Sequence, residues 1–413
     1  MTIPHILLAN VFFAPFSYGG ATIVAEQVSK QLVSRGTARI SAVSLISRKE
    51  LTPYSVIRSQ VGPIDNYLIN MPQGRKYTQF YDNPDVGRVF ADLMRDLQPD
   101  LLHAHCIQEV GVDVLRVARV AGVPSILSVH DFWWICERQF MVRMDQRYCG
   151  QDPVKIEACK GCVGNWRAAR RRFDVLSETA SLVDMVTYPS AFARNLCEAS
   201  GLAPGKGVVW ENGVHLPGPD FAQAQARRRA RDPRLVFGFV GGPSQIKGWP
   251  IMRDAFKRLK RKDFRVHLVE GSLDGSWWRD QRLTDLPGDW SVVPRYSQEN
   301  MDDFYVGIDV LLFLSQWKET FGLAIREALA RNIHVIQTDS GGTTEHNAID
   351  RKDLIPIRSD PNVVRDHLER ALVAHPDYRP SRVMPIGFDD QTAQFETLME
   401  TVLSDTRHTS RAG

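Results

Sequence analysis

The amino-acid sequence predicts an α/β protein built from two doubly wound parallel sheets. Short, continuous apolar runs alternate with amphipathic stretches along almost the whole chain. Buried parallel strands have this composition, and each parallel pair needs a helical crossover between its strands. The chain of 413 residues is too long for one ordinary domain, and the segment 217–234, rich in Ala, Arg and Gln, separates two series of runs. We therefore expect two Rossmann-like domains of about 200 residues each.

The strands of the first series are expected in the runs HILLANV, ISAVSLI, LLHAH, SILSVHD, MVTYPS and GVVWENG. Residues 21–34 and 85–97 lie between these runs and have the periodicity of amphipathic helices. The second series contains RLVFGFVG, FRVHLVEG, WSVVPRY, VLLFLS, HVIQTD and LIPI. Residues 391–403 predict a last helix packed on the domain body, and the polar end beyond it is expected to fray.

These series give the expected domain boundaries. The N-terminal domain covers residues 1–216 and carries an insert at 131–166, the C-terminal domain covers residues 217–385, and residues 386–413 form a helix and tail that can pack back on the N-terminal domain. Two open sheets that face each other form a cleft at the carboxyl ends of their strands, where ligands of such sheets bind. The candidate motifs follow predicted strands, as this rule requires.

The composition excludes several functions. The net charge of +3 is too small for a nucleic-acid-binding domain, which is usually strongly basic. No apolar stretch approaches the ~20 residues that span a bilayer. The apolar start, residues 5–15, lacks the basic leader and cleavage site of a signal peptide, so it is interpreted as the first strand. We expect a cytoplasmic protein.

The segment SQWKETFGLAIREALA contains two carboxylates, Glu319 and Glu327, with seven residues between them. Glu319 follows the predicted strand VLLFLS, and Glu327 lies in the helix that starts near Gly322. Gly322 allows close backbone approach, and the amides at a helix start point toward an anion. Carboxylates beside such a site can accept hydrogen bonds from sugar and ribose hydroxyls. The alternative is a pair of solvated surface acids.

Two glycine turns follow predicted strands. Gly241 and Gly242 follow RLVFGFV and lead to Lys247, just before a helix. A lysine beside a helix N-terminus suits a diphosphate, because a mobile ammonium and backbone donors both attract the anion. A surface lysine at a helix start is the alternative. Gly19 and Gly20 form a similar turn after the first strand, where the backbone either approaches a phosphate or simply turns.

The insert carries four of the six cysteines, spaced C-x12-C-x9-C-x2-C: Cys136, Cys149, Cys159 and Cys162. Four thiolates at such spacing fit a tetrahedral structural zinc, with an iron–sulfur cluster as the less favoured occupant. Four reduced cysteines, some of them packed in the core, are the alternative. The cysteines of a chain this long do not form a disulfide framework.

Two further features lie in the insert and just beyond it. The aromatic residues Trp133, Trp134 and Phe140 form either a stacking surface or part of a core. Residues 166–176 predict an amphipathic helix with four arginines, which either contacts anionic lipid or is a solvated basic face. The arginines are Arg167, Arg170, Arg171 and Arg172.

Together and in this order, the motifs resemble those of the family 4 retaining glycosyltransferases of the GT-B fold. The resemblance extends over nearly the whole chain, from the glycine turn at 19–20 through LLHAH, SVHD and ENGV to the E-x7-E segment and a GG-x-x-E turn at 341–345. It implies transfer of a sugar from a nucleoside diphosphate to an acceptor hydroxyl, with retention of anomeric configuration. The expected donor is a UDP- or GDP-sugar bound by the C-terminal domain without a divalent metal. The expected acceptor is a glycan, a lipid-linked sugar or a small molecule, and lipid-linked acceptors make peripheral contact with an anionic membrane plausible.

The resemblance also implies roles for donor-site residues. Glu327 corresponds to the carboxylate that holds the nucleotide ribose. Glu319 corresponds to the catalytic-site carboxylate that meets the transferred sugar, beside the amides of Phe321, Gly322 and Leu323. Lys247 corresponds to the lysine that binds the donor diphosphate, with the glycine turns at 19–20 and 241–242 beside the phosphates.

In the N-terminal domain, His130 corresponds to the histidine near the reacting sugar, with a core or capping histidine as the alternative. His103 and His105 rank second to His130. Asp131 with Trp133 and Trp134 is placed on the acceptor side.

One position departs from the family pattern. Relatives often have an arginine in the turn before the lysine, and this chain has Gly242 there. Arg326 or Arg295 is then expected to supply the missing charge, or the diphosphate depends more on Lys247 and backbone amides. No D-x-D pattern is placed to hold a metal beside the donor.

Two other functions stay open: a nucleotide-sugar epimerase of the same architecture, and a non-catalytic protein that binds sugars or nucleotides. The FGL segment and the insert favour transfer over epimerisation, and the joint presence of His130, Lys247, Glu319 and Glu327 favours catalysis over binding alone. A metal-dependent redox protein would leave the second half of the chain unexplained. The particular nucleotide, sugar and acceptor, and the oligomeric state, are left open.

Overall fold

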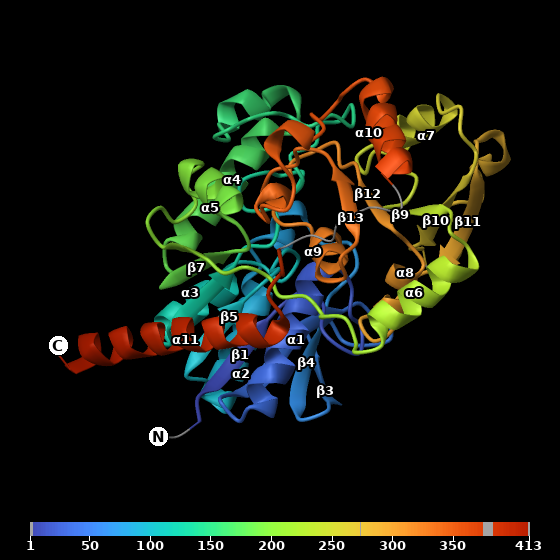
Figure 1. Cartoon of the computed structure of the whole chain (residues 1–413). Coiled ribbons are helices and arrows are strands. Elements are labelled where there is room, and N and C mark those ends of the chain that lie inside the picture. The colour runs from blue at the N-terminus through green and yellow to red at the C-terminus, as the bar shows by residue number, and fades with distance from the viewer. Residues whose placement is uncertain (1–2, 273, 375–382, 412–413) are drawn as a thin grey trace. The chain divides into compact units, whose positions relative to one another are not determined.

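The computed structural model describes residues 3–272, 274–374 and 383–411. The chain divides into two compact units, each with its own sheet (Figure 1). The N-terminal unit consists of Met1–Phe140, Gly150–Gly213 and Phe388–Gly413. The C-terminal unit consists of Met141–Cys149 and Val214–Gly387. Part of the expected insert is therefore grouped with the C-terminal unit.

The N-terminal unit contains an eight-stranded sheet in the order β3-β4-β2-β1-β5-β6-β7-β8. The strands are β1 (His5–Ala9), β2 (Arg39–Ile46), β3 (Val56–Val61), β4 (Ile64–Asn70), β5 (Leu101–Ala104), β6 (Ser125–Ser128), β7 (Met185–Tyr188) and β8 (Gly207–Val209). All neighbouring pairs are parallel except the antiparallel hairpin of β3 and β4. Every residue of β1, β5 and β6 is buried, as in strands that are covered on both faces.

The helices of this unit connect the strands and cover the sheet. They are α1 (Gly20–Ser34), η1 (Tyr77–Phe80), α2 (Pro84–Leu97), α3 (Asp113–Val120), η2 (Ile156–Gly161), α4 (Trp166–Ala180), α5 (Ala191–Ala199) and α11 (Phe388–Arg411). The boundaries of α2 follow from local chemistry, because the side chain of Asn83 accepts from the amide of Val86 and Pro84 occupies the first position.

The last helix, α11, returns from the C-terminal unit and packs against α1 (Figure 1). Arg35 at the end of α1 pairs with Asp389 at 3.0 Å and with Glu396 at 3.2 Å. The fully buried Phe395 contacts Trp210, with ring centroids 5.2 Å apart. This helix therefore completes the core of the N-terminal unit.

The C-terminal unit contains a five-stranded parallel sheet in the order β11-β10-β9-β12-β13. The strands are β9 (Leu235–Phe239), β10 (Phe264–Glu270), β11 (Asp289–Pro294), β12 (Val310–Phe313) and β13 (His334–Gln337). The helices are α6 (Phe221–Arg231), α7 (Trp249–Lys257), η3 (Leu283–Asp285), α8 (Met301–Val306), α9 (Leu323–Ala330), η4 (Gly342–Thr344), η5 (Arg351–Asp353) and α10 (Pro361–Ala374).

Two apolar layers cover the two faces of this sheet. Phe237 on β9 packs with Met252 of α7 and Leu368 of α10, whereas the next-door Val236 packs with Tyr305 of α8 and Ile325 of α9. Neighbouring residues of a strand point to opposite faces of the sheet, so each strand contributes side chains to both apolar layers. The predicted fold class, two doubly wound parallel-sheet domains, is confirmed.

Some elements differ from the expectation. The hairpin of β3 and β4 was not expected, because its strands lack a continuous apolar run and β3 is largely exposed. The run LIPI forms no strand and contributes only an isolated bridge between Thr338 and Ile355. The polar end continues as helix to Arg411 instead of fraying after residue 403, and residues 412–413 lie outside the described residues.

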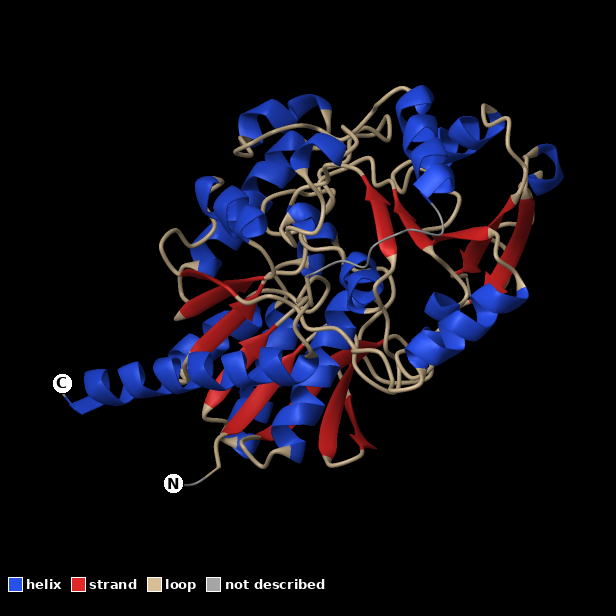
Figure 2. Ribbon diagram, in the orientation of Figure 1, coloured by secondary structure: helices blue, strands red, loops and turns tan. Residues whose placement is uncertain are grey.

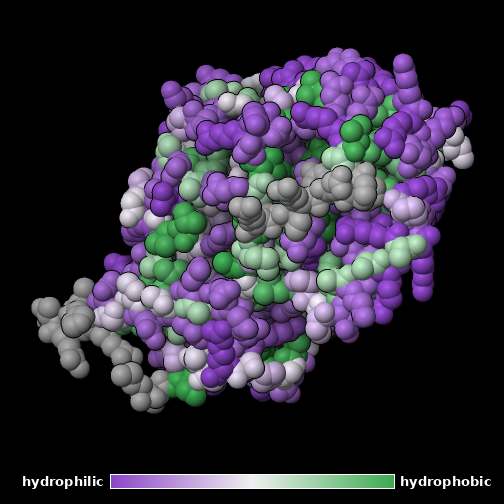
Figure 3. Space-filling view, viewed as in Figure 1, coloured by the Kyte–Doolittle hydropathy of each residue, from purple (hydrophilic) through white to green (hydrophobic). Residues whose placement is uncertain are grey.

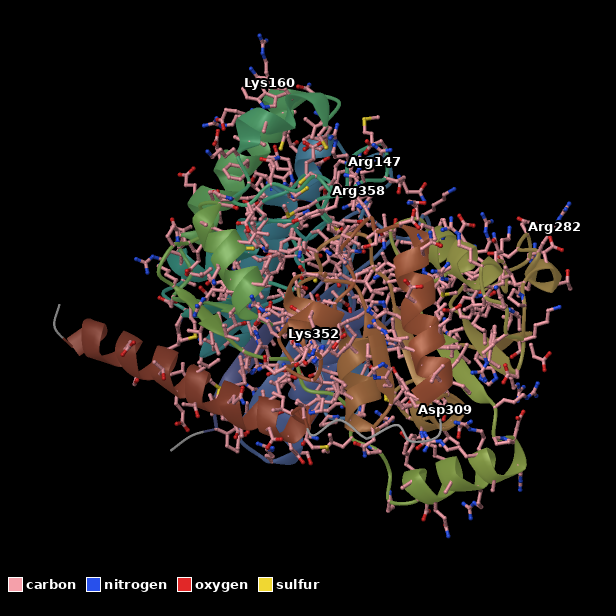
Figure 4. The ribbon with its side chains drawn as sticks, turned by 45° about the horizontal axis from the view of Figure 1, so that its top comes forward. Arg147, Lys160, Arg282, Asp309, Lys352 and Arg358 are labelled. Atoms are coloured by element: carbon pink, nitrogen blue, oxygen red, sulfur yellow. The ribbon has the colours of Figure 1, made fainter. Side chains whose placement is uncertain are left out.

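The segment 217–234 contains the helix α6, whose basic end is ion-paired. Arg228 and Arg229 both contact Asp309, which lies beside α6 in Figure 4, at 2.6 Å and 2.8 Å. These ion pairs hold α6 against the start of β12. The charges of the two arginines are therefore largely balanced by Asp309.

Two observations bear on the predicted absence of a membrane span. Within the described ranges, no helix is long and apolar enough to cross a membrane. Hydrophilic residues dominate the face drawn in Figure 3, with smaller apolar areas between them.

The chain between β6 and α4 is mostly loop, as Figure 2 shows, with the short helix η2 and a bridge between Val142 and Tyr148.

Candidate functional site

Lys247 and Glu319 meet at the carboxyl edge of the C-terminal sheet. Lys247 follows β9 and Glu319 follows β12, the two neighbouring strands between which the strand order reverses. The Nζ atom of Lys247 lies 2.8 Å from Oε1 of Glu319, and the hydroxyl of Ser315 donates to the same oxygen. The reversal point of an open α/β sheet is its usual ligand site, and this is where the two predicted residues are joined.

The backbone brings these two loops together. The amide of Gln316 donates to the carbonyl of Ile246 at 2.7 Å. Gly248 has a φ of 84°, and a Cβ there would lie 2.1 Å from the carbonyl oxygen of Leu314. Only glycine permits this approach, so α7 begins directly against the end of β12.

The loop that carries Glu319 is also pinned to the turn after β13. The amide of Glu319 donates to the carbonyl of Ser340 at 2.9 Å, and its carbonyl accepts from the amide of Gly342 at 3.0 Å. This short parallel bridge fixes the backbone of Glu319 on both sides. The carboxylate of Glu319 is therefore held toward Lys247 by main-chain bonds.

Arg326 links the loop that carries Glu319 to the turn after β13. Its guanidinium donates to the carbonyls of Phe321, Thr343 and Gly342 at 3.0, 2.7 and 3.2 Å. The side chain is 1% exposed and lies 4.2 Å from the centroid of the Phe321 ring. From the sequence, Arg326 was expected to supply the positive charge missing near the diphosphate. In the structure its side chain is buried and bound to backbone carbonyls.

The start of α9 offers unused backbone donors. Within the described chain, no protein group accepts a hydrogen bond from the amides of Phe321, Gly322 and Leu323. Gly322 has a φ of 84° and caps the helix, with its Cβ position 3.0 Å from Thr343. Three free amides at a helix N-terminus form a site for an anion or a polarised oxygen.

Glu327, the second carboxylate, lies inside the unit on α9. Its Oε2 accepts from the hydroxyl of Tyr305 at 2.8 Å, and the hydroxyl of Tyr296 lies 3.4 Å from that of Tyr305. Burial raises the pKa of Glu327 above its usual value. The two tyrosines were not predicted, because Tyr305 has the spacing of a core residue on α8 and nothing in the sequence relates it to α9.

The loop before α7 uses its own backbone donors. The amide of Lys247 donates to the hydroxyl of Ser244, that of Gly248 to the carbonyl of Gln245, and that of Trp249 to the carbonyl of Ser244. Backbone donors were expected beside Lys247, but these three are already engaged. These three amides are therefore not available to an anion, which leaves the lysine ammonium and the remaining amides of the loop.

Trp277 explains why glycine replaces the family arginine at 242. Gly242 has a φ of 68°, and a Cβ there would lie 2.7 Å from the indole ring of Trp277. The same ring lies 2.3 Å from the Cβ position of Gly271, after β10. The indole thus covers the space that an arginine side chain would need. Arg295, the other expected cation, is exposed after β11.

In the N-terminal unit, the glycine turn at 19–20 precedes α1. Gly19 has a φ of 83° and is the N-cap residue, with no atom within 4 Å of its Cβ position. Its backbone conformation, and not close packing, is what requires glycine there. Gly20 is the first residue of α1.

His130 lies beyond the end of β6, next to the histidines of β5. Its Nε2 is 2.9 Å from Nδ1 of His105, and burial lowers the pKa of His130 to about 4. The carboxylate of Asp131 accepts from the amide of Trp133 at 2.8 Å and from the side chain of Gln139 at 2.6 Å, and burial raises its pKa. Asp131 thus organises the turn that enters the insert.

Two tryptophans of the insert and one arginine of α4 have structural roles, whereas Phe140 is exposed. Trp133 and Trp134 are buried and pack edge to face, so they are core aromatics and not a stacking surface. Arg172 is buried as well, donates to the carbonyl of Trp133 at 2.6 Å and lies over its ring. The apolar side of α4, including Leu176, faces the unit, and Arg170 pairs with Asp174. Membrane contact through α4 stays a prediction, with Arg167 and Arg171 as the exposed cations.

The zinc prediction is not supported. In the part of the chain that the structure describes, no group of three or more His, Cys, Asp or Glu side chains is arranged to hold a metal ion. The C-x-x-C pair lies at η2, where the Cys159 thiol contacts the side chain of Gln151 and the carbonyl of Lys155. These local contacts hold the thiol on its own turn. Sequence spacing alone could not show that the four cysteines do not converge.

The fold and the families that the chain matches define the class of protein: a glycosyltransferase of the GT-B fold. Residues 18–216 match the family described as Glycosyltransferase Family 4, and residues 234–372 match that described as Glycosyl transferases group 1. The chain therefore consists of a Glycosyltransferase Family 4 domain followed by a Glycosyl transferases group 1 domain, as the resemblance of its motifs implied.

Solved structures share the fold at low identity. The chain is similar to sucrose-phosphate synthase from Thermosynechococcus elongatus, with a TM-score of 0.62 and 16% identity over 99% of this chain and 98% of that one. It is similar to HepE from Anabaena in complex with UDP-glucose, with a TM-score of 0.58 and 14% identity over 99% of this chain and 100% of that one. A relative described as an uncharacterized 42.6 kDa protein in the cps region of Klebsiella pneumoniae is 20% identical, over 84% of this chain and 88% of its own length.

A pair of glycine substitutions tests whether Trp277 excludes a second cation. Gly275→Arg places a side chain at a positive φ with nothing within 4 Å of the Cβ, whereas Gly242→Arg must also displace the indole. We expect about 1–2 kcal/mol of destabilisation for Gly275→Arg and about 1–3 kcal/mol more for Gly242→Arg. Urea unfolding followed by tryptophan fluorescence measures both. Equal losses in the two variants would show that the indole does not restrict position 242.

Proposed function

We propose that the protein is a retaining glycosyltransferase that moves a sugar from a nucleoside-diphosphate sugar to a hydroxyl of a glycan, a lipid-linked sugar or a small molecule. One observation carries the proposal: the ammonium of Lys247, the carboxylate of Glu319 and the unused amides at the start of α9 belong to adjoining loops at one sheet edge. A cation and amide donors suit a diphosphate, and a carboxylate suits sugar hydroxyls.

The roles follow from the chemistry of each group. Lys247 and the amides of Phe321, Gly322 and Leu323 bind the donor phosphates and stabilise the charge that develops on the leaving diphosphate. Glu319 accepts hydrogen bonds from the transferred sugar, and Glu327 accepts them from the ribose. Because a diphosphate is already a good leaving group, positioning and charge stabilisation supply most of the catalysis. We assign His130 to the reacting sugar because it corresponds to the family histidine with that role.

The ion pair between Lys247 and Glu319 implies an exchange of partners when the donor binds. The ammonium of Lys247 leaves Glu319 and pairs with the diphosphate. The carboxylate of Glu319 then accepts hydrogen bonds from the sugar hydroxyls. A nucleoside diphosphate without a sugar satisfies only the first half of this exchange. The protein should therefore bind the intact donor better than the product nucleotide at this pair.

The comparisons support a nucleotide sugar as the donor. HepE was solved with UDP and with UDP-glucose, and the Klebsiella pneumoniae relative is encoded in a cps region. We propose UDP as the first nucleotide to test and GDP as the second. A role in polysaccharide synthesis fits these relatives.

The direct test combines a donor screen with product analysis. UDP-, GDP- and dTDP-sugars are compared by thermal shift, since a ligand at 100 times its dissociation constant adds about 2.7 kcal/mol of stability. The stabilising donor is then incubated with and without glycan acceptors, and the anomeric configuration of the product is read by NMR. A product with inverted configuration would reject the retaining mechanism, and isomerised sugar formed from donor alone would identify an epimerase.

Replacing Lys247 should remove most of the leaving-group stabilisation. We expect Lys247→Ala to reduce turnover by roughly 100-fold or more, as loss of a charge-stabilising donor does in other enzymes. Lys318→Ala is the matched control, because Lys318 is close in sequence to Glu319 but pairs with Asp339 at 3.1 Å. Steady-state kinetics of both variants check this assignment, and activity of Lys247→Ala within a few-fold of the parent would refute it.

Neutralising Glu319 should separate nucleotide binding from transfer. In Glu319→Gln, the diphosphate no longer competes with a carboxylate for Lys247, so we expect about 3- to 10-fold tighter binding of the nucleoside diphosphate, the range of a half-buried ion pair. The rate of sugar transfer should fall, because the hydroxyls of the transferred sugar lose the charged carboxylate that accepts their hydrogen bonds. Titration calorimetry compares this variant with Asp339→Asn, which removes a neighbouring carboxylate that does not contact Lys247. Unchanged or weaker nucleotide binding in Glu319→Gln alone would contradict the exchange.

A further inference from the structure

We propose that His105 is a positioning residue, which donates a hydrogen bond from Nδ1–H to Nε2 of His130 and so keeps the proton of His130 on Nδ1. The inference rests on the proposed function only in giving His130 a place beside the reacting sugar. The hydrogen bond and the tautomer are properties of the protein itself.

The parallel pairing of β5 and β6 creates the contact. Ala104 at the end of β5 lies opposite Leu127 of β6, so the residues that follow the two strands emerge side by side. The amide of His105 donates to the carbonyl of Ala9 at 2.9 Å, which fixes its backbone against β1. The rings of His105 and His130 are nearly parallel, with an angle of 13° and centroids 5.2 Å apart.

A second histidine holds the ring of His105 in place. His103 lies 4.0 Å from His105, centroid to centroid, and its other neighbour is Phe395 of α11 at 4.4 Å. Nε2 of His103 contacts the hydroxyl of Ser128 at 2.8 Å, and Ser128 in turn contacts Thr187 at 2.7 Å. His103 is therefore fixed by stacking and by hydrogen bonds, and it leaves His105 little freedom to rotate.

The contact between two neutral rings can hold only one proton. Either His105 donates from Nδ1 to Nε2 of His130, or His130 donates from Nε2 to Nδ1 of His105. In the second case the remaining proton of His105 sits on its Nε2. The surroundings of that nitrogen decide between the two arrangements.

Nε2 of His105 has no hydrogen-bond partner among the described protein atoms, and the residue is 1% exposed. A proton there would be a buried donor without an acceptor, a group that folded proteins rarely keep, whereas an unused lone pair is tolerated more often. The proton of His105 therefore belongs on Nδ1. His130 must then accept through Nε2 and carry its own proton on Nδ1.

The arrangement defines what His130 can do in the reaction. Burial lowers the pKa of His130 to about 4, so the ring is neutral at pH 7. A neutral ring whose Nε2 accepts from His105 carries its proton on Nδ1 and has no free basic nitrogen. His130 can then act as a hydrogen-bond donor through Nδ1 but not as a general base.

Three variants of His105 distinguish a hydrogen bond from packing. Asn carries its amide nitrogen at the position of Nδ1 and keeps the donor, Gln moves the amide one carbon further, and Leu has no donor. We expect turnover to fall about 10-fold or more for His105→Leu and His105→Gln with the donor KM little changed, the size of effect known when a metal-binding histidine loses its hydrogen-bond partner. His105→Asn should stay within about threefold of the parent, since it keeps the donor. Thermal unfolding of each variant monitors stability.

The tautomer is read directly from long-range proton–nitrogen NMR spectra of protein with 15N-labelled histidine. We expect Nδ1 of His130 to be protonated in the parent and in His105→Asn, and the preference to be lost in His105→Leu. A parent with the proton on Nε2, or the same tautomer in His105→Leu, would overturn the proposal. The parent spectrum decides the point even where a variant does not fold. It needs no turnover, so a protein that transfers no sugar would refute the proposed function without deciding this one.

Discussion

Three backbone carbonyls bind one buried guanidinium, that of Arg326, and the shape of the candidate donor site depends on these hydrogen bonds. Charge in a protein interior is costly unless hydrogen bonds satisfy it. The carbonyls of Phe321, Gly342 and Thr343 do so here, and they belong to the two loops that must stay in register for Glu319 to face Lys247. Because Arg326 occupies these carbonyls, the loop before α9 is held in a shape that leaves its amides unused. Arg326 thus shapes the proposed anion site through the backbone, with its own charge bound to carbonyls.

The two units support their candidate residues by different means. In the C-terminal unit, main-chain bonds between loops set the direction of Glu319, and side-chain hydroxyls hold Glu319 and Glu327. In the N-terminal unit, stacked rings and a chain of hydroxyls set the histidines. Phosphate binding needs donors in fixed positions, which a rigid backbone supplies. A histidine needs one defined tautomer, which depends on its ring partners.

The sequence was informative where a pattern reflects a general requirement of the fold. Apolar runs located most buried strands, and the position after a strand located Lys247 and Glu319, because ligand sites of parallel sheets lie at that edge. It was uninformative where the outcome depends on which distant side chains meet. Nothing in the spacing of Tyr305 relates it to Glu327. Arg172 has the sequence pattern of a surface residue, but its side chain is buried and donates to the carbonyl of Trp133. The spacing of the four cysteines suggested a shared metal, but among the described residues no such group of side chains comes together. The polar β3 lacks the apolar run on which strand prediction relies.

The return of α11 to the first sheet has a consequence for biosynthesis. Phe395 lies against His103 and Trp210, and Gln391 accepts from the amide of Gly213, so residues near the end of the chain complete a core begun at its start. A ribosome makes the N-terminal strands first, yet these strands remain partly uncovered until the whole C-terminal unit has been translated. That unit can fold as it emerges, because Val214–Gly387 supply nearly all of it. The second half of the molecule is therefore expected to mature before the first, and the N-terminal sheet is the part that most needs protection from aggregation during synthesis.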